Sequence, residues 1–237
     1  MAASFKFYFH PLSQPSRALW QFFIEAKLNF EPVVVDLMKG EHKTPQYLAK
    51  NPDGMVPMIE HDGVFFNEST AFAQYLVDVF PDVPDHYLPR DCKQRAKVNA
   101  LLSRYHVTPR QQRFAFYYPV FARLMNALPD DWEARVAISK GFQEETAQFV
   151  QRYLDRARKE YLGGDLLCLA DFFWFQEVKE LEAFDLFDTK LFDKYPLFAA
   201  WYKKLNERDS SVTVNKTLEE TGCAYKARAG PFAALKD

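Results

Sequence analysis

The chain has 237 residues, with 30 Lys and Arg against 32 Asp and Glu, and a formal charge of −2. This length allows one large domain or two modest ones, and the near balance of charge excludes a general electrostatic attraction to nucleic acid or to an anionic membrane. Polar residues interrupt the N-terminal apolar stretch and no apolar run is long enough to span a bilayer, so we expect a soluble cytoplasmic protein without a signal peptide.

The first elements of the chain alternate between strand-like and helix-like patterns. Residues 5–9 form a short aromatic stretch with strand-like alternation, and apolar residues recur at helical spacing over 18–26. Residues 30–35 are rich in β-branched side chains, which favours a second strand. A β-α-β unit of this kind normally returns its second strand parallel to the first. Residues 44–50 indicate a short helix or an irregular loop.

A hairpin and a helix follow. Asp62-Gly63 separates the short apolar runs 57–60 and 64–66, which predicts two antiparallel strands joined by a tight turn. The next pattern is helical over 68–80, with Asn67 as the expected N-cap. The order β-α-β-α-β-β-α is that of a small thioredoxin-like domain of the α/β class.

Beyond this domain the helical period dominates. Long amphipathic stretches cover about 91–127, where Pro109 and Pro119 should break the helix, and 131–161, which should end at Gly163-Gly164. Another helix is expected from about Leu169 and a further one from Pro196. At the former, Leu167 and Phe172 are placed as a hydrophobic staple and Asp171 occupies the third helical position.

The patterns therefore predict two domains. We expect a thioredoxin-like domain over 1–80 and a proline-punctuated linker over 81–90. An all-helical bundle domain should cover 91–237, with residues 223–237 as a tail or a lid. Cysteines at 92, 168 and 223 are too few and too far apart for a metal site or a disulfide framework, so we expect no metal.

The segment Ser13-Gln14-Pro15-Ser16 lies where the first strand ends and the first helix begins. A thioredoxin-like oxidoreductase needs cysteines in a Cys-x-x-Cys motif here, so serine at positions 13 and 16 excludes dithiol exchange. Ser13 could cap the helix, with Pro15 in its first turn. The same junction suits an anion, because free backbone N–H groups and the helix dipole favour negative charge. The residues alone leave both interpretations open.

Two further motifs have a functional and a structural interpretation. Val56-Pro57 precedes the third strand, where a proline can protect a sheet edge. A cis proline at this point would instead expose the preceding backbone groups to an extended peptide. Glu68-Ser69 can cap the following helix, or its side chain donors and free N–H groups can bind a ligand carboxylate.

In this order and spacing the motifs resemble the cytosolic glutathione transferases, most closely their theta class. The resemblance covers most of the chain and is most specific up to about residue 110. It is carried by the segments Leu12–Ala18, Val35–His42, Asn51–Pro57, Asn67–Ser69, Asp85–Tyr87 and Arg95–Val98, with Leu169–Asp171 further along.

The resemblance implies glutathione as co-substrate, a small electrophile as its partner and a homodimeric assembly. Ser13 would be the catalytic residue, whose hydroxyl donates a hydrogen bond to the glutathione sulfur and so favours the thiolate. Val56 would pair with the cysteinyl part, Glu68 and Ser69 would bind the γ-glutamyl end, and His42 would face the glycyl carboxylate. The full implied glutathione site is Gln14, His42, Lys43, Val56, Pro57, Glu68, Ser69 and Arg110.

The electrophile is expected to bind between the two domains. The candidate lining residues are His10, Pro11, Phe114, Tyr117, Tyr118 and the tail around Tyr225, although a buried core would show the same aromatic residues.

Two positions depart from the family pattern. Cys168 replaces the usual Ser or Thr of a capping box, and a thiol is a weak acceptor, which costs up to about 1 kcal/mol. Val107 stands where some theta members carry an acidic residue.

Two functions fit these observations. The first is an enzyme that conjugates glutathione to small electrophiles, with peroxide reduction or dehalogenation as related outcomes. The alternative is a non-catalytic binding module of the same fold in a protein assembly, but such modules often lose the glutathione residues that are present here. A Cys-active thiol transferase is disfavoured by serine at positions 13 and 16.

Overall fold

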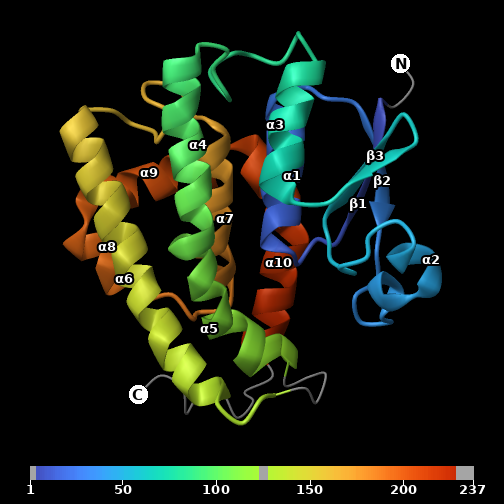
Figure 1. Cartoon of the computed structure of the whole chain (residues 1–237). Helices are drawn as coiled ribbons and strands as arrows, with labels where there is room; N and C mark the ends of the chain where they lie inside the picture. The colour runs from blue at the N-terminus through green and yellow to red at the C-terminus, as the bar shows by residue number, and fades with distance from the viewer. Residues whose placement is uncertain (1–3, 123–127, 228–237) are drawn as a thin grey trace.

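The computed structural model describes residues 4–122 and 128–227 (Figure 1). Its N-terminal part is a four-stranded sheet with the strand order β2-β1-β3-β4. β1 and β2 are parallel, whereas β3 is antiparallel to both β1 and β4, so the predicted crossover and hairpin are confirmed. The elements are β1 (Phe5–Phe9), α1 (Gln14–Glu25), β2 (Phe30–Val34), η1 (Glu41–Lys43), α2 (Pro45–Leu48), β3 (Met58–His61), β4 (Val64–Phe66) and α3 (Ser69–Val79).

The two faces of this sheet are covered by different helices. Phe5, Phe7 and Phe9 point into the large core that includes α1 and α3. Tyr8, between them in sequence, packs in a separate cluster with Tyr47 of α2. This alternation follows from the two-residue period of a strand. The sheet is thus a two-sided layer, as the thioredoxin-like prediction requires.

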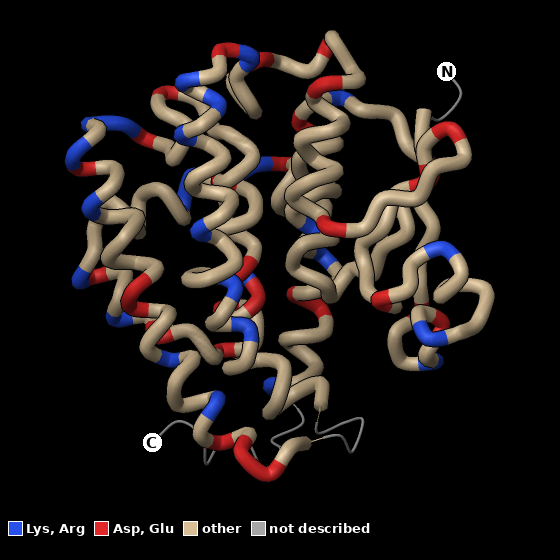
Figure 2. Tube along the Cα trace, viewed as in Figure 1, with Lys and Arg blue, Asp and Glu red and all other residues tan. Residues whose placement is uncertain are grey.

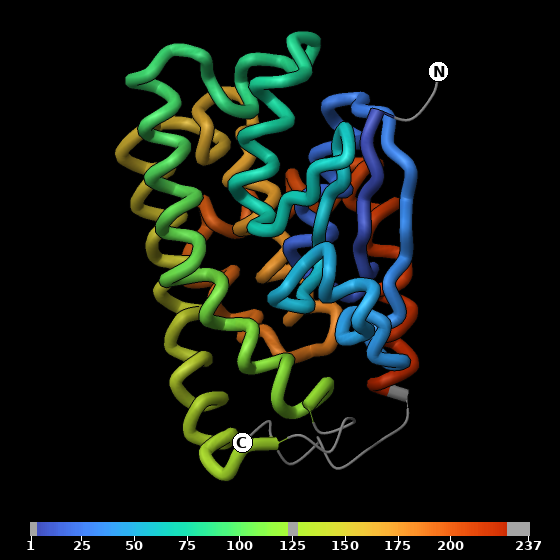
Figure 3. Tube along the Cα trace, turned by 45° about the vertical axis from the view of Figure 1, so that its right-hand side comes forward, coloured from blue at the N-terminus to red at the C-terminus, as the bar shows by residue number. Residues whose placement is uncertain are grey.

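The C-terminal part is a bundle of helices. In Figures 1 and 3, α4 and α6 run along the side that is far from the sheet, and α7 lies between them and α1. Figure 2 shows Lys and Arg intermixed with Asp and Glu over the outer helices. The elements are α4 (Cys92–Val107), η2 (Pro109–Arg113), α5 (Phe114–Phe116), η3 (Tyr117–Ala122), α6 (Trp132–Ala157), α7 (Leu169–Ala183), α8 (Lys190–Lys194), α9 (Pro196–Asn206) and α10 (Asp209–Ala227). Within the described ranges, no helix combines the length and apolar character needed to cross a membrane.

Several predicted boundaries were wrong. α6 ends at Ala157 and not at Gly163-Gly164, because Arg158 adopts the left-handed conformation that terminates a helix (φ 50°). α3 begins at Ser69 with Glu68 as its N-cap. The side chain of Asn67, the predicted cap, instead donates to Asn51 and Asp53.

The end of the chain also differs from the prediction. α10 continues to Ala227, so the first residues of the predicted tail or lid are helical. The remainder of that segment, 228–237, lies outside the described residues. The break predicted at Pro109 is confirmed, since α4 ends at Val107 and η2 starts at Pro109. Pro119 lies within η3, a π-helical segment.

α1 joins the two parts of the molecule. The Phe22 ring contacts Phe172 of α7, with centroids 6.2 Å apart. At the other end of α1, Glu25 accepts two hydrogen bonds of 2.7 Å from the guanidinium of Arg208. Tyr87 in the predicted linker accepts a hydrogen bond from the Leu169 amide at the start of α7. The position of α1, and therefore of Ser13, is set by the helical half as well as by the sheet.

The start of α7 depends on one buried acid. Asp171 is fully buried and accepts hydrogen bonds from the amides of Leu162 (2.8 Å) and Cys168 (2.7 Å) and from the Trp201 indole (2.8 Å). The Cys168 side chain makes the reciprocal contact with the Asp171 amide, so a capping box forms even with a thiol at its first position. One carboxylate thus connects the loop before α7, α7 itself and α9.

Asp171→Ala is expected to lower the free energy of unfolding by about 3 kcal/mol or more, because buried donors lose a charged acceptor. Urea unfolding followed by fluorescence measures this loss. The control is Asp165→Ala, which removes only an exposed ion pair with Lys159 and should cost less than about 1 kcal/mol. Equal losses in the two variants would show that the Asp171 network does not stabilise the fold.

Candidate active site

The predicted glutathione-binding residues of the thioredoxin-like part lie at one end of the sheet. Tyr8 of β1 pairs with Met58 of β3, so the end of β1 adjoins the start of β3. Ile59 pairs with Phe66, which places the end of β4 at the same edge. Because β2 is parallel to β1, its end lies there too. The segments that follow or precede these strands carry Ser13, His42, Val56-Pro57 and Glu68-Ser69.

The loop before α1 is held by backbone and imidazole hydrogen bonds. The Leu12 amide donates to His10 Nδ1 (3.2 Å) and the Ser13 amide donates to the His10 carbonyl (2.9 Å). Burial lowers the pKa of His10 against the opposing charge of Asp36, and the charge of Arg17 adds to the effect of burial. A neutral imidazole is required for Nδ1 to accept the Leu12 N–H.

Ser13 is the N-cap residue of α1, but its side chain makes no capping hydrogen bond. Its backbone is extended (φ −86°, ψ 121°), as is usual at this position. The side chain is half-buried at the helix N-terminus, where unpaired N–H groups favour an anion. The structure therefore does not support the interpretation of Ser13 as a side-chain cap.

The Val56-Pro57 peptide bond is cis, as predicted. The loop before it is fixed through the carbonyl of Met55, which accepts hydrogen bonds from the Tyr47 hydroxyl (2.6 Å) and the Asn51 side chain (2.9 Å). Tyr47 and Asn51 are both buried. Residues of α2 and of the segment that follows it thus hold this loop in place.

Glu68 adopts a left-handed backbone conformation (φ 70°, ψ 89°), which is uncommon for a residue with a Cβ. Such residues are concentrated at ligand sites, where the surrounding structure maintains them. The Glu68 side chain is exposed and Ser69 is half-buried, at the start of α3. This conformation is an independent reason to regard Glu68 as a binding residue.

The predicted glycyl-binding residues are in η1. Lys43 Nζ donates to the Asp53 carbonyl (3.3 Å), which ties η1 to the loop that precedes the cis-proline. His42 Nδ1 is buried and has no hydrogen-bond partner within residues 4–122 and 128–227. Burial, followed by the charge of Lys43, lowers the pKa of His42, which therefore favours the neutral form.

Arg110 is partly buried and forms an ion pair with a fully buried carboxylate, so it is not in an exposed salt bridge. Its Nη1 donates to Glu177 Oε1 on α7 (3.0 Å), and Tyr105 donates to the same oxygen (2.7 Å). Interaction with Glu177 and Tyr105 outweighs burial and raises the pKa of Arg110, so the side chain stays charged.

The sequence patterns did not single out His106, which the structure places beside the start of α3. Its Nε2 lies 3.4 Å from the Thr70 hydroxyl, and the charge of Glu68 acts on its ionisation. Burial is the largest influence and lowers the pKa of His106. A single sequence contains no signal for this contact, because the two residues are far apart in the chain and only the tertiary fold brings them together.

The aromatic residues predicted for the electrophile site lie in two environments. Phe114 and Tyr118 stack on one another and pack with Val136 of α6, and Tyr118 also accepts a hydrogen bond from Arg135. Tyr117 is 42% exposed. Tyr225 instead contacts Phe184, just beyond α7, and Phe116, which was not among the predicted residues, contacts the same ring. Gln14 is buried in the first turn of α1, and Pro11 accepts a hydrogen bond from Arg17 (3.1 Å).

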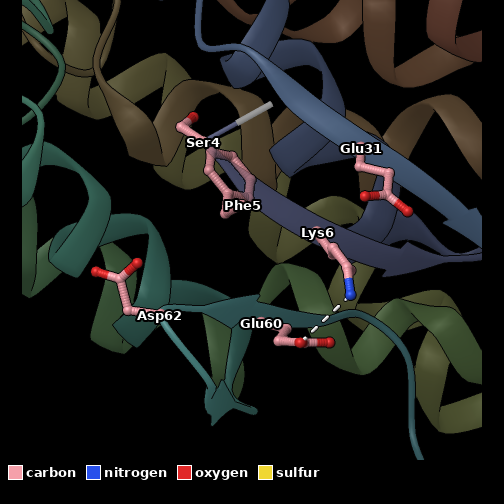
Figure 4. A pocket seen from close by; sticks show the side chains of 6 residues that line it. All are labelled: Ser4, Phe5, Lys6, Glu31, Glu60 and Asp62. Carbon is pink, nitrogen blue, oxygen red and sulfur yellow. Dashed lines mark hydrogen bonds and ion pairs between the residues drawn. The ribbon is translucent and has the colours of Figure 1, made fainter. Parts of the chain in front are cut away.

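A separate shallow pocket lies on the sheet (Figure 4). It contains the Lys6–Glu60 ion pair (3.4 Å) and none of the predicted site residues. Its lining residues are Ser4, Phe5, Lys6, Glu31, Glu60 and Asp62. Across the described part of the chain, no cluster of His, Cys, Asp and Glu is suited to hold a metal ion.

Comparison with known proteins identifies the family. Residues 3–78 match the family model described as glutathione S-transferase, N-terminal domain, and residues 118–210 match the corresponding C-terminal domain. The chain is 32% identical over 212 residues to a dichloromethane dehalogenase of Methylorubrum extorquens, covering 88% of this chain and 73% of that protein. The chain belongs to the glutathione S-transferase family. Glutathione is the co-substrate of this family.

Theta-class proteins are among the relatives and structural neighbours. Glutathione S-transferase theta-1 of Rattus norvegicus is 29% identical over 237 residues, which is 95% of this chain and 91% of that protein. The structure of human glutathione S-transferase T1-1 in its apo form superposes with a TM-score of 0.79 at 25% identity, covering 92% of this chain and 91% of that one. The relatives are named as enzymes, so the family assignment favours the catalytic hypothesis over the binding module. It confirms the theta-like resemblance.

Proposed function

We propose that this glutathione transferase conjugates glutathione to small electrophiles through a thiolate that the Ser13 hydroxyl stabilises. The observation that supports this role is the placement of Ser13 at the N-terminus of α1 with a side chain that makes no capping hydrogen bond. A hydroxyl in this position can donate to an anion that the helix terminus already favours. The roles of the other glutathione-binding residues rest on the same site.

The proposed reaction needs no covalent bond to the protein. The Ser13 O–H donates to the glutathione sulfur, which lowers the pKa of the thiol and increases the fraction present as thiolate. The thiolate then attacks the electrophilic atom and the leaving group departs with the bonding electron pair. Val56, Glu68 and Ser69 would hold the tripeptide across the sheet end, so that sulfur lies near Ser13.

Ser13→Ala is expected to raise the pKa of bound glutathione by about one to two units and to lower kcat/KM by about 10- to 100-fold, as for loss of a hydrogen bond to a charged group. Thiolate absorbance during a pH titration measures the first effect, and calorimetry measures glutathione affinity. Ser103→Ala, at an exposed position of α4, is the matched control. Wild-type turnover in Ser13→Ala would rule out the proposed role.

A halogenated alkane is the substrate class that the relatives favour. Two curated relatives are named dichloromethane dehalogenase, one of them at 32% identity. In this reaction the sulfur forms a bond to carbon, the carbon–chlorine bond breaks and chloride leaves with the electron pair. We expect glutathione-dependent chloride release from dichloromethane, measured with a chloride electrode and absent without glutathione. No release above the uncatalysed rate would exclude dichloromethane as a substrate.

We also propose a homodimer that acts in the cytoplasm. The family is commonly dimeric, and Cys92, Cys168 and Cys223 are all free thiols, which suits a reducing compartment. Light scattering on the purified protein should give twice the 27.7 kDa of one chain. A mass of one chain at micromolar concentration would contradict the dimer.

A further inference from the structure

Glu180 is a buried acid that the proposed reaction does not use. It lies in the last turns of α7 and is 1% exposed. Neither carboxyl oxygen has a hydrogen-bond partner among the residues that the structure describes. An ionised carboxylate in such a place is costly, so the group calls for a physical explanation.

The packing of two helices places Glu180 beside the N-terminal end of α1. Phe22 contacts Phe172, and one turn nearer the start of α1 the Arg17 Nε donates to Gln176 Oε1 (3.0 Å). The two helices are therefore antiparallel, and they lie side by side in Figures 1 and 3. Glu180 is one helical turn beyond Gln176. Because the two helices are antiparallel, this turn of α7 lies beside the first turn of α1.

Three charged side chains act on the ionisation of this carboxyl: fully buried Arg17 of α1, Arg110 of η2 and Glu177 of α7 itself. Tyr105 of α4 donates a hydrogen bond to Glu177. Burial is the largest influence on Glu180 and the like charge of Glu177 adds to it, which outweighs both arginines and raises its pKa to about 8.

With Glu180 protonated, the set of side chains formed by Arg17, Arg110, Glu177 and Glu180 carries a net positive charge at neutral pH. Glu177 balances one of the two arginines, and a protonated Glu180 contributes no charge. The Arg17 guanidinium donates to the Pro11 carbonyl (3.1 Å), and its charge acts on the ionisation of His10. The positive charge of Arg17 therefore reaches the loop that ends at Ser13.

We propose that Glu180 is a positioning residue for the glutathione reaction: as a neutral acid it leaves the Arg17 charge uncompensated, and this charge favours the glutathione thiolate beside Ser13. The inference rests on the function proposed above. Ionised Glu180 would cancel the charge and weaken binding of the thiolate. The ionisation of Glu180 would then set the upper pH limit of tight glutathione binding.

The test compares glutathione binding by the wild type and by Glu180→Gln, which is neutral at every pH and of similar size. Near neutral pH the two proteins should show the same thiol pKa and dissociation constant. Above about pH 8 the wild type should bind the thiolate about tenfold more weakly, because the ionised carboxylate then cancels the charge of Arg17. Glu182→Gln, on the same helix, should follow the wild type.

Stability supplies a readout that does not depend on glutathione. The unfolded chain loses the Glu180 proton near pH 4.5, whereas the folded chain keeps it to about pH 8. Between these values the folded state binds more protons, so the free energy of unfolding of the wild type falls as pH rises. The stability of Glu180→Gln relative to the wild type should therefore increase over this range and level off above it.

Three outcomes separate the hypotheses. The inference holds if Glu180→Gln removes both the alkaline loss of affinity and the pH-dependent loss of stability. It is overturned if the two proteins share one binding profile through pH 8, or if Glu180→Gln lowers the thiol pKa near neutral pH, which would mean that Glu180 is ionised there. Failure of the Ser13 role would instead appear as an unchanged thiol pKa in Ser13→Ala, whatever Glu180→Gln does.

Discussion

The packing of α1 against α7 is the interaction on which the site depends. α1 carries Ser13 at its first turn and is pressed between the sheet and the helical half (Figure 3). Apolar contact through Phe22 sets the separation of the two helices. Arg17 donates a hydrogen bond to Gln176, and Gln176 donates one to Gln21. Because hydrogen bonds are directional, these two also fix the rotation of α1 about its axis. A hydroxyl at the end of a helix held in this way has little freedom to move.

The same packing buries charge, and this burial has opposite effects on stability and on chemistry. Placing Arg17 and Glu180 out of contact with water costs folding free energy. Inside a medium of low dielectric constant, however, the remaining positive charge acts over a longer distance than it would at the surface. In the proposed mechanism, α7 of the helical half thus sets the electrostatic environment of the bound thiolate.

Local chemistry explains which features could be predicted. Asp62-Gly63 specifies its turn through backbone conformation, and Val56-Pro57 and the segment around Ser13 are recognisable as short motifs. The end of α6 at Arg158 was not predictable, because its left-handed residue lacks the usual glycine. The environment of Glu180 was equally hidden, since residues far apart in the chain create it. The types of the elements could thus be predicted from the sequence, whereas the charge environment of buried groups depends on the tertiary packing.

The two ends of the sheet differ: one end carries predicted site residues, and the other end tolerates changes in the chain. The segments of the thioredoxin-like half that carry predicted site residues leave or enter at one end of the four strands. The hairpin turn at Asp62-Gly63 is at the opposite end, both residues are exposed, and a Cβ at Gly63 would meet no atom within 4 Å. Exposed turns of this kind accept insertions. An affinity tag or fluorescent label placed in this turn would leave the glutathione end of the sheet untouched.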